Sequence, residues 1–294
     1  MLDAPVKPQA RECAGGQEPL MPYWPLAVDR DNLTLMGVSF PDLKSLEMIA
    51  EAIDSCMFEG FRPSGREIEI VRDCCLGKIT LARLASGLMD GNVSDAGGMG
   101  GPDFPYVDPA TGVLRNAMGI SDRGSLAFAE YVVCARRLCE LAEKPVSVRD
   151  SSGILAVHRH LFQDIYAWSG EPRTVDICKG NTSFLSVTHF RFAFRHIDDL
   201  LTDLWKVDGA DREAIARMLG KILAAVNYLH PFREGNGRTQ REFLRLIALE
   251  RRWSLNLHRN EDADAFDRYM KGTVNDDEDV LASLIYERLT VMSN

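Results

Sequence analysis

The chain has 294 residues, of which 46% are hydrophobic and 26% charged, and its formal net charge is -9. This length allows one large domain or two smaller ones. The negative charge excludes nonspecific binding to nucleic acid or to an anionic membrane as the bulk behaviour. A stretch of about 18 apolar residues, which a membrane-spanning helix requires, does not occur. The first residues also lack the basic and then apolar pattern of a secretory signal.

Cysteine usage indicates a reducing compartment. The seven cysteines contain no C-x-x-C pair, and most of them lie inside apolar helical patterns. We therefore expect buried, reduced thiols, a cytoplasmic location and no structural zinc. The cysteines are Cys13, Cys56, Cys74, Cys75, Cys134, Cys139 and Cys178. His158 and His160 have no other residue at metal-ligand spacing, so we expect them to be packed or on the surface.

The first clear helical pattern begins after residue 40. Residues 1–40 show no sustained period and stay unassigned, with part of them expected to be disordered. Apolar residues then recur at the spacing of one helix face: Leu43, Leu46, Ile49, Ala50, Ile53 and Met57. Asp42 is placed to cap this helix, and Gly60 followed by Pro63 predicts its end.

Two further helical patterns complete a small N-terminal unit. They cover about 64–75 and 80–89, with Gly77 between them. We therefore expect residues 41–90 to form an all-helical unit. Five glycines follow among residues 90–102, so we predict a linker over 91–102 that spans on the order of 20 Å and joins two packed units without dictating their contact.

The remaining residues, 103–294, are expected to form a mainly α-helical domain. Its helices are predicted at about 122–143, 151–165, 188–205, 211–229 and 237–251, with at least one more near 262–291. The helix over 211–229 shows a clear buried stripe, formed by Ile215, Met218, Leu219, Ile222, Leu223 and Val226. One β-hairpin is expected, in which 173–178 and 183–187 bracket a turn.

The segment from His230 to Arg241 carries the chemistry. Its letters are HPFREGNGRTQR, and it directly follows the stripe of the helix over 211–229. Gly235-Asn236-Gly237 at the start of a helix leaves backbone N–H groups unpaired at the positive end of the helix dipole, which is an anion site suited to phosphates. The glycines permit positive φ and close approach of the backbone to a ligand.

Charged side chains of the same segment suit phosphoryl chemistry. Arg238 and Arg241 lie three residues apart, so both guanidinium groups can reach the same anion. Glu234 lies at the turn, where a carboxylate could hold Mg²⁺ against phosphates. His230 ends the preceding helix and can take a proton from an attacking hydroxyl. A capped helix–turn–helix corner with solvated arginines would explain any one of these features, but their arrival together in this order favours the functional interpretation.

This string resembles the signature of the Fic family, His-x-Phe-x-(Asp/Glu)-Gly-Asn-Gly-Arg-x-x-Arg, at every fixed position. The resemblance implies transfer of AMP from ATP to a hydroxyl side chain of a target protein, with pyrophosphate as the leaving group. His230 would then be the base, and Glu234 would bind Mg²⁺. Asn236 and Gly237 would hold the α-phosphate region, and Gly235 would also belong to the nucleotide site. The same resemblance implies that Arg238 and Arg241 hold the β- and γ-phosphates.

Other parts of the chain extend this resemblance over about 106–285. Family members that transfer phosphate have lysine in place of Arg238, and those that transfer phosphocholine alter the Gly-Asn-Gly stretch, so AMP is the expected group. The stretch from His160 to Arg173 resembles the core helix of the family. Lys179 and Gly180 resemble its flap hairpin, which pins an extended target segment by strand addition and would border the nucleotide.

The N-terminal unit resembles an inhibitor of this family. Ser55, Glu59 and Gly60 match the pattern (Ser/Thr)-x-x-x-Glu-(Gly/Asn) of the inhibitory helix of Fic antitoxins; alone, the pattern is typical of an ordinary helix C-terminus. The resemblance implies that Glu59 pairs with Arg241 and occupies the γ-phosphate position. Tethering through the linker would raise the effective concentration of the inhibitor into roughly the millimolar range.

The resemblance therefore implies an autoinhibited protein adenylyltransferase of toxin–antitoxin type, with ATP as substrate and Mg²⁺ as cofactor. The target would present Tyr, Ser or Thr, and a type II topoisomerase is one expectation. Two alternatives stay open. One is a non-catalytic nucleotide-binding scaffold, which would not need His230. The other is an effector delivered to another cell, although we expect no room for a delivery domain before Asn294.

Overall fold

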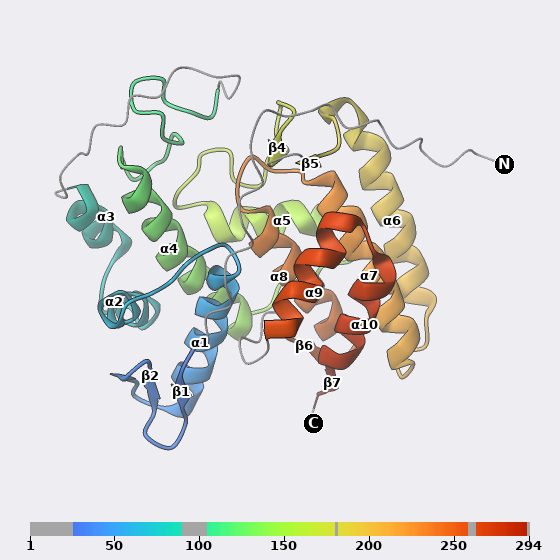
Figure 1. Cartoon of the computed structure of the whole chain (residues 1–294), viewed down its shortest axis with the longest axis horizontal. Helices are drawn as coiled ribbons and strands as arrows, with labels where there is room; N and C mark the ends of the chain where they lie inside the picture. The colour runs from blue at the N-terminus through green and yellow to red at the C-terminus, as the bar shows by residue number, and fades with distance from the viewer. Residues whose placement is uncertain (1–25, 90–104, 180–181, 258–262, 293–294) are drawn as a thin grey trace.

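The computed structural model describes residues 26–89, 105–179, 182–257 and 263–292 (Figure 1). Within these ranges the chain is mainly helical and carries three small antiparallel sheets. The predicted linker over 91–102 lies outside the described residues. No helix in the described ranges is both long and apolar enough to cross a bilayer. All six cysteines in these ranges are free thiols.

A three-stranded meander precedes the first helix. Its strands β1 (Val28–Asp29), β2 (Thr34–Leu35) and β3 (Val38–Ser39) pair in chain order. This part of the chain showed no period in the sequence, because strands of two residues are too short to display alternation. Residues 1–25 lie outside the described ranges.

Helices α1 (Leu43–Met57), α2 (Gly65–Cys75) and α3 (Leu81–Met89) have nearly the predicted bounds. Local capping explains where the first two begin. The Asp42 carboxylate accepts a hydrogen bond from the N–H of Ser45 at 2.7 Å. The Ser64 side chain and the N3 glutamate of α2 form a reciprocal capping box.

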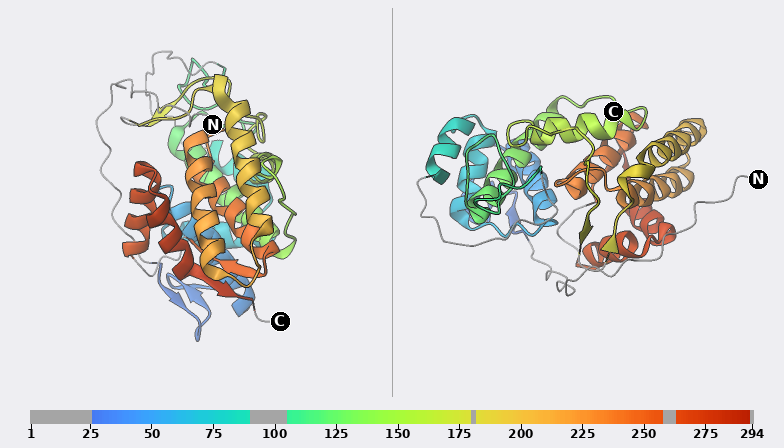
Figure 2. Two further views of the ribbon diagram at one scale, coloured as in Figure 1. Left: turned by 90° about the vertical axis from the view of Figure 1, so that its right-hand side faces the viewer. Right: turned by 90° about the horizontal axis from the view of Figure 1, so that it is seen from above.

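The N-terminal helices share one core with the rest of the chain. Helix α4 (Arg123–Glu143) packs against α1, α2 and α3 (Figure 2). Leu46, Ile49 and Ile53 of the predicted stripe are fully buried, whereas Leu43 in the first turn is 46% exposed. A single hydrophobic cluster runs through both parts, so the two parts share an extensive apolar contact.

Helix α8 (Asn236–Glu250) contacts α1, α5 and α7, and the remaining helices pack against α8 or against α7. These helices are α5 (Ser152–Phe162), α6 (Phe190–Lys206), α7 (Arg212–Leu229), α9 (Ala263–Asn275) and α10 (Glu278–Arg288). Helices α7 and α10 lie close together because Gly220 has no side chain: a Cβ there would be 2.9 Å from the main-chain N of Ala282. The helical region predicted near 262–291 consists of two helices, α9 and α10.

The predicted hairpin is present but shorter than expected. Strands β4 (Cys178–Lys179) and β5 (Thr182–Ser183) pair Cys178 with Ser183. A 3-10 turn at Val187–His189 then leads into α6. The sequence did not predict a further two-stranded sheet, formed by β6 (Trp253–Leu255) and β7 (Leu289–Val291).

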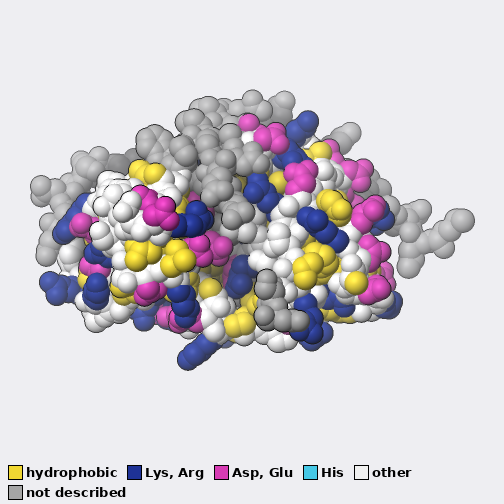
Figure 3. Space-filling view, turned by 90° about the horizontal axis from the view of Figure 1, so that it is seen from below, with side chains coloured by type: hydrophobic (Ala, Val, Ile, Leu, Met, Phe, Trp, Pro, Cys, Tyr) yellow, Lys and Arg dark blue, Asp and Glu magenta, His cyan; other side chains and the backbone are white. Residues whose placement is uncertain are grey.

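The surface carries charges of both signs. On the face seen from below, basic and acidic side chains are interspersed with apolar ones among the described residues (Figure 3). This face therefore offers no extended basic region of the kind that binds nucleic acid nonspecifically.

Candidate active site

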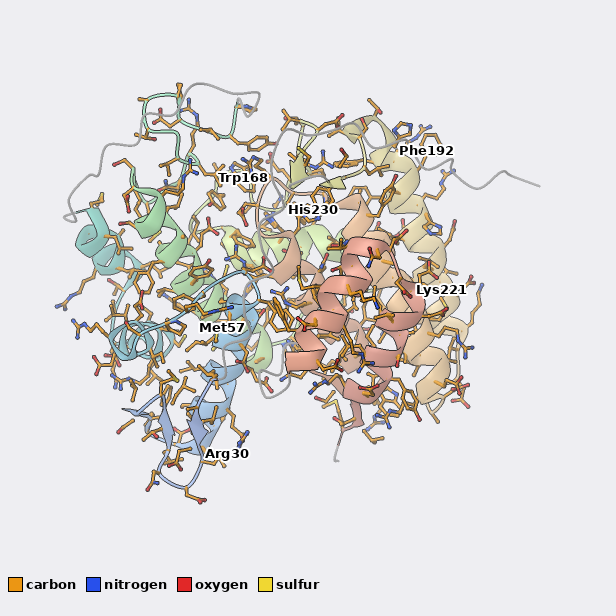
Figure 4. The ribbon with its side chains drawn as sticks, in the orientation of Figure 1. Arg30, Met57, Trp168, Phe192, Lys221 and His230 are labelled. Atoms are coloured by element: carbon orange, nitrogen blue, oxygen red, sulfur yellow. The ribbon has the colours of Figure 1, made fainter. Side chains whose placement is uncertain are left out.

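The segment from His230 to Arg241 forms the corner between α7 and α8. Helix α7 ends at Leu229, and His230 takes a left-handed conformation with φ of 43°. Pro231 follows and disfavours continuation of the helix through the residue before it. Figure 4 labels His230 at this end of α7, near the flap strands. Helix α8 begins at Asn236 after Gly235, whose φ is 80°.

Asn236 braces the loop that carries His230. Its Oδ1 accepts a hydrogen bond from the N–H of Phe232 at 2.9 Å, and its Nδ2 donates to the Phe232 carbonyl at 2.8 Å. The Asn236 side chain is thus committed to the protein backbone, and the residue is 6% exposed. An anion at this corner would therefore meet the main-chain N–H of Asn236 rather than its amide group.

The ring of His230 is oriented by two contacts. Phe184, which follows β5, stacks on it with centroids 3.5 Å apart and an interplanar angle of 15°. His230 Nδ1 lies 3.3 Å from the carbonyl oxygen of Asn227. Because a carbonyl can only accept, Nδ1 carries the proton in this contact, and Nε2 has the lone pair that a general base needs.

Glu59 lies against the first turn of α8. Its Oε1 is 2.8 Å from Nη2 of Arg241, and the same Nη2 donates to the Ser55 carbonyl at 2.8 Å. A Cβ added at Gly237 would overlap Glu59 Oε1. The carboxylate therefore occupies the place where the unpaired N–H groups of α8 begin.

Arg241 is enclosed on all sides. Its side chain is 2% exposed, and its guanidinium lies 5.1 Å above the ring of Phe58 and 5.8 Å from that of Tyr269. Burial lowers the pKa of Arg241, but the charges and hydrogen bonds of Glu59 and Tyr269 together outweigh burial and raise the pKa above its usual value. Arg241 is therefore charged, and Glu59 is its acidic partner.

Two contacts hold the segment that contains Glu59. Tyr131 of α4 donates a hydrogen bond from its hydroxyl to the Glu59 carbonyl at 3.0 Å. The Tyr131 ring stacks on Phe61 at 4.6 Å. Gly60 lies between these contacts with φ of 95°, a conformation that favours glycine, and it turns the chain after α1. Ser55, one turn before Glu59, is 1% exposed.

Arg238 points to a different partner from Arg241. Its Nη2 lies 2.9 Å from Glu130 Oε2 and 3.3 Å from Glu234 Oε1, and its side chain is 2% exposed. Burial and these acidic neighbours act in opposite directions, and the net effect raises the pKa of Arg238 well above its usual value. The two arginines of the motif thus do not share an anion in this structure, although three residues separate them.

The sequence analysis did not identify Glu130. It lies in α4 and is 7% exposed, and the Tyr166 hydroxyl donates a hydrogen bond to its Oε1. Burial raises the pKa of Glu130, while the charge of Arg238 opposes that rise. One signal was present: Glu130 is a carboxylate on a helix face shared with the buried Leu126 and Val133.

Glu234 is the carboxylate that could hold a cation. Its side chain is 38% exposed, and its Oε1 accepts a hydrogen bond from the N–H of Gly235 at 2.8 Å. Within the described ranges no group of three or more His, Cys, Asp or Glu residues could form a metal site. A single carboxylate beside a phosphate site nevertheless suits Mg²⁺, which is usually held by one or two carboxylates together with substrate phosphates and water.

His158 is a second residue whose role only the structure reveals. It is fully buried, and its ring stacks on Phe232 at 3.6 Å. Its Nε2 lies 3.1 Å from the Glu234 carbonyl, and its Nδ1 accepts a hydrogen bond from the N–H of Gly170 at 2.8 Å. Burial lowers the pKa of His158 to about 3. The neutral imidazole thus supports the turn from behind.

The flap is described in part. Lys179 lies in β4 opposite Thr182 of β5, and Gly180 lies outside the described residues. Phe184 connects the flap to His230 by the stacking contact above. Of the residues predicted from the sequence, the structure brings together His230, Glu234, the first turn of α8, Arg241 and Glu59.

Comparison with known proteins places the residues of this site in a known family. The model of the Fic/DOC family matches residues 149–248. Protein adenylyltransferase VbhT of Bartonella schoenbuchensis is 34% identical over 191 residues, which are 65% of this chain and 40% of that protein. The chain thus spans less than half the length of VbhT. A protein of Salmonella typhimurium named "probable protein adenylyltransferase Fic" is 36% identical over 155 residues, covering 52% of this chain and 76% of its own length.

Solved structures share the fold. The N-terminal Fic domain of a Bartonella effector protein (Bep), from Bartonella sp. AR 15-3, aligns with a TM-score of 0.57 and 22% identity, covering 63% of this chain and 91% of that chain. With the signature at the corner of α7 and α8, this fold and these relatives lead to one conclusion: the chain belongs to the Fic/DOC family.

Proposed function

We propose that this chain is a protein adenylyltransferase, which transfers AMP from ATP to a hydroxyl side chain of a target protein. The observation that carries the proposal is the corner of α7 and α8. There, His230 Nδ1 lies against the Asn227 carbonyl, a contact that places the lone pair of a neutral imidazole on Nε2, and the ring lies beside a helix N-terminus that suits a phosphate. Relatives named protein adenylyltransferases, at 34% and 36% identity, support it.

The chemistry follows from these groups. His230 takes the proton of the target hydroxyl as its oxygen attacks the α-phosphorus, and the bond from that phosphorus to the bridging oxygen breaks, releasing pyrophosphate. The N–H groups of Asn236 and Gly237 would stabilise the charge on the α-phosphate. Mg²⁺ held by Glu234 would neutralise charge on the neighbouring phosphates.

The same proposal includes an internal inhibitor. The Glu59 carboxylate pairs with Arg241 at 2.8 Å and lies over the first turn of α8. Of the two arginines of α8 in the motif, Arg241 is the one paired with Glu59, because Arg238 pairs with Glu130. A carboxylate in this place competes with the terminal phosphate of ATP for both the guanidinium and the site. Glu59 therefore keeps transfer slow until the segment moves.

The test compares variants of the full chain incubated with ATP labelled at the α-phosphate and with Mg²⁺. Glu59→Gly should transfer label to protein much faster than the wild-type chain. Glu59→Gly combined with His230→Ala should bind ATP but transfer no label. Asp73→Asn removes a carboxylate from the same helical unit, where it pairs with Arg72, and should leave the rate unchanged.

Three outcomes would contradict the proposal. Equal label in the wild-type chain and in Glu59→Gly would exclude an inhibitory role for Glu59. Transfer that survives His230→Ala would exclude His230 as the base. ATP binding without transfer in Glu59→Gly would favour a nucleotide-binding scaffold.

The target is proposed only by chemical class, as a protein with an accessible Tyr, Ser or Thr. Peptide mapping of a lysate treated with Glu59→Gly would identify it, and a purified type II topoisomerase can be assayed directly. If the topoisomerase stays unmodified in that assay, it is excluded as the target. The proposal that the chain is an adenylyltransferase would not be affected.

A further inference from the structure

Arg173 contacts the loop that carries His230. We propose that Arg173 is a positioning residue, which holds His230 in its strained backbone conformation and links it to both limbs of the flap. The inference rests on the proposed function, because it assigns a role in proton transfer by His230. Arg173 lies between α5 and β4, and its side chain has no exposed surface.

Arg173 makes two hydrogen bonds to the loop that carries His230. Arg173 Nε donates a hydrogen bond to the carbonyl of His230 at 2.9 Å, and its main-chain N–H donates to the carbonyl of Pro231 at 2.7 Å. His230 has φ of 43°, in a region that residues other than glycine rarely adopt. Such a conformation persists only where the surroundings over-determine it. Arg173 supplies two of the hydrogen bonds that do so.

Arg173 also contacts the flap. Arg173 Nη1 donates to the carbonyl of Val175 at 2.6 Å, and Nη2 donates to the carbonyl of Leu185 at 2.5 Å. Val175 precedes β4 and Leu185 follows β5, so one guanidinium joins the two limbs at the base of the hairpin. Its carbon lies 4.8 Å from the ring centroid of Phe190, which covers it.

Arg173 also affects the orientation of the His230 imidazole, through Leu185 and Phe184. Phe184, whose ring stacks on His230 at 3.5 Å, directly precedes Leu185. The N–H of Leu185 also donates to the carbonyl of Tyr228 in the last turn of α7. Fixing Leu185 therefore fixes Phe184 over the imidazole. Arg173 thus controls both the backbone of His230 and the ring that sets its side-chain orientation.

Lysine cannot replace arginine here. The three side-chain hydrogen bonds come from three different nitrogens of one planar guanidinium, whereas the three donors of a lysine ammonium all lie on a single nitrogen. A lysine would keep the positive charge and much of the volume but would lose the fork. Arg173→Lys is therefore the variant that separates positioning from charge.

The experiment uses Glu59→Gly as the parent chain and compares Arg173→Lys with Arg251→Lys within it. Arg251 is a matched control, because its guanidinium also donates to a backbone carbonyl, that of Val207, and lies 5.8 Å from the Trp205 ring. We expect Arg173→Lys to lower kcat for AMP transfer by about 30-fold, since a small misplacement of a catalytic group has large effects. Its Kd for ATP should stay within about twofold of the parent, and Arg251→Lys should change neither value by more than about twofold.

A spectroscopic readout separates positioning from a general loss of structure. The Cε1–H resonance of His230, identified by its absence in His230→Ala, should be displaced by the ring current of Phe184. In Arg173→Lys it should move toward the value of an exposed histidine, and in Arg251→Lys it should stay in place. An unchanged kcat together with an unmoved resonance would overturn the inference.

A second variant covers the case in which Arg173→Lys does not fold. Phe184→Leu leaves Arg173 in place and removes the stacked ring, so it should abolish the displacement of the His230 resonance and lower kcat. Normal kcat in that variant would overturn the inference. If the parent itself transfers no AMP, the proposed function fails, and the resonance alone still decides whether Arg173 positions His230.

Discussion

The hydroxyl of Tyr131 donates a hydrogen bond to the main-chain carbonyl of Glu59 at 3.0 Å. This contact links α4 to the segment that covers Arg241. It acts on the backbone of Glu59, so it positions the carboxylate without competing for it. Burial raises the pKa of Tyr131 to about 12, and the hydroxyl therefore remains a donor across the physiological range.

Tyr131→Phe should accordingly weaken the inhibitor without removing it. The variant keeps the stack on Phe61 and loses one hydrogen bond, which contributes about 1 kcal/mol, or roughly a fivefold change in an equilibrium. We expect AMP transfer about fivefold faster than in the wild-type chain and slower than in Glu59→Gly. Tyr286→Phe, at an exposed ring, is the control. A rate equal to that of the wild-type chain would exclude a role for this contact.

Glu130→Gln should destabilise the fold. It leaves the buried guanidinium of Arg238 without its nearer carboxylate, and removing one partner of a buried ion pair costs about 3 kcal/mol or more. Urea unfolding measures the change. Glu287→Gln removes the partner of Arg268 at a site where Glu287 is 51% exposed, and it should cost less than about 1 kcal/mol. Equal losses in the free energy of unfolding would mean that the buried pair of Glu130 and Arg238 contributes no more to stability than an exposed pair.

His158 should make stability depend on pH. Its folded pKa is about 3, below the ordinary value of 6.5, so below pH 6.5 the unfolded chain binds a proton that the folded chain does not. The contribution is present above pH 6.5 and is lost as pH falls toward 3, by at most about 1.4 kcal/mol per pH unit.

Urea unfolding between pH 7.5 and pH 5 tests this expectation. The free energy of unfolding should fall less steeply in His158→Gln than in the wild-type chain, because glutamine does not titrate. His196→Gln, at an exposed histidine, should keep the wild-type slope. Parallel slopes in the wild-type chain and His158→Gln would contradict the assignment.

Gly235→Ala should be far more harmful than an ordinary glycine substitution. Gly235 has φ of 80°, and a Cβ there would overlap the ring of Phe162. Gly77 has a similar φ of 73° with nothing within 4 Å, so Gly77→Ala measures the backbone strain alone, about 1 kcal/mol. We expect Gly235→Ala to cost about 2 kcal/mol more, because overpacking adds to the strain. Thermal and urea unfolding of both variants give the comparison.

Local signals were sufficient to predict the helices. Asp42 and Ser64 begin α1 and α2 by capping contacts that depend only on neighbouring residues. The stripe of α7 predicted its buried face, and of its six members only Met218 is less than fully buried. The strands of two or three residues were harder to predict, because they are too short for an alternating pattern and depend on partners distant in the sequence.

Residue chemistry and spacing predicted the candidate site only where it is contiguous in the chain, whereas the expected pairing of Glu59 with Arg241 came from the family resemblance. His230, Glu234 and the first turn of α8 adjoin one another, so their spacing carried the prediction. Glu130 is 108 residues from Arg238, and no local pattern could pair them. The bridging role of Arg173 depends on its carbonyl acceptors, which every residue possesses and no sequence displays.

Phe58 directly precedes Glu59, and its ring meets those of Phe266 and Tyr269 edge-on, with centroids 5.0 and 5.5 Å apart. A movement of the N-terminal helices away from α9 would expose all three rings to solvent. Exposing apolar rings to water costs free energy, and this cost opposes the movement. Under the proposed inhibition by Glu59, departures of Phe58 from these rings should therefore be brief, and AMP transfer should occur in short bursts.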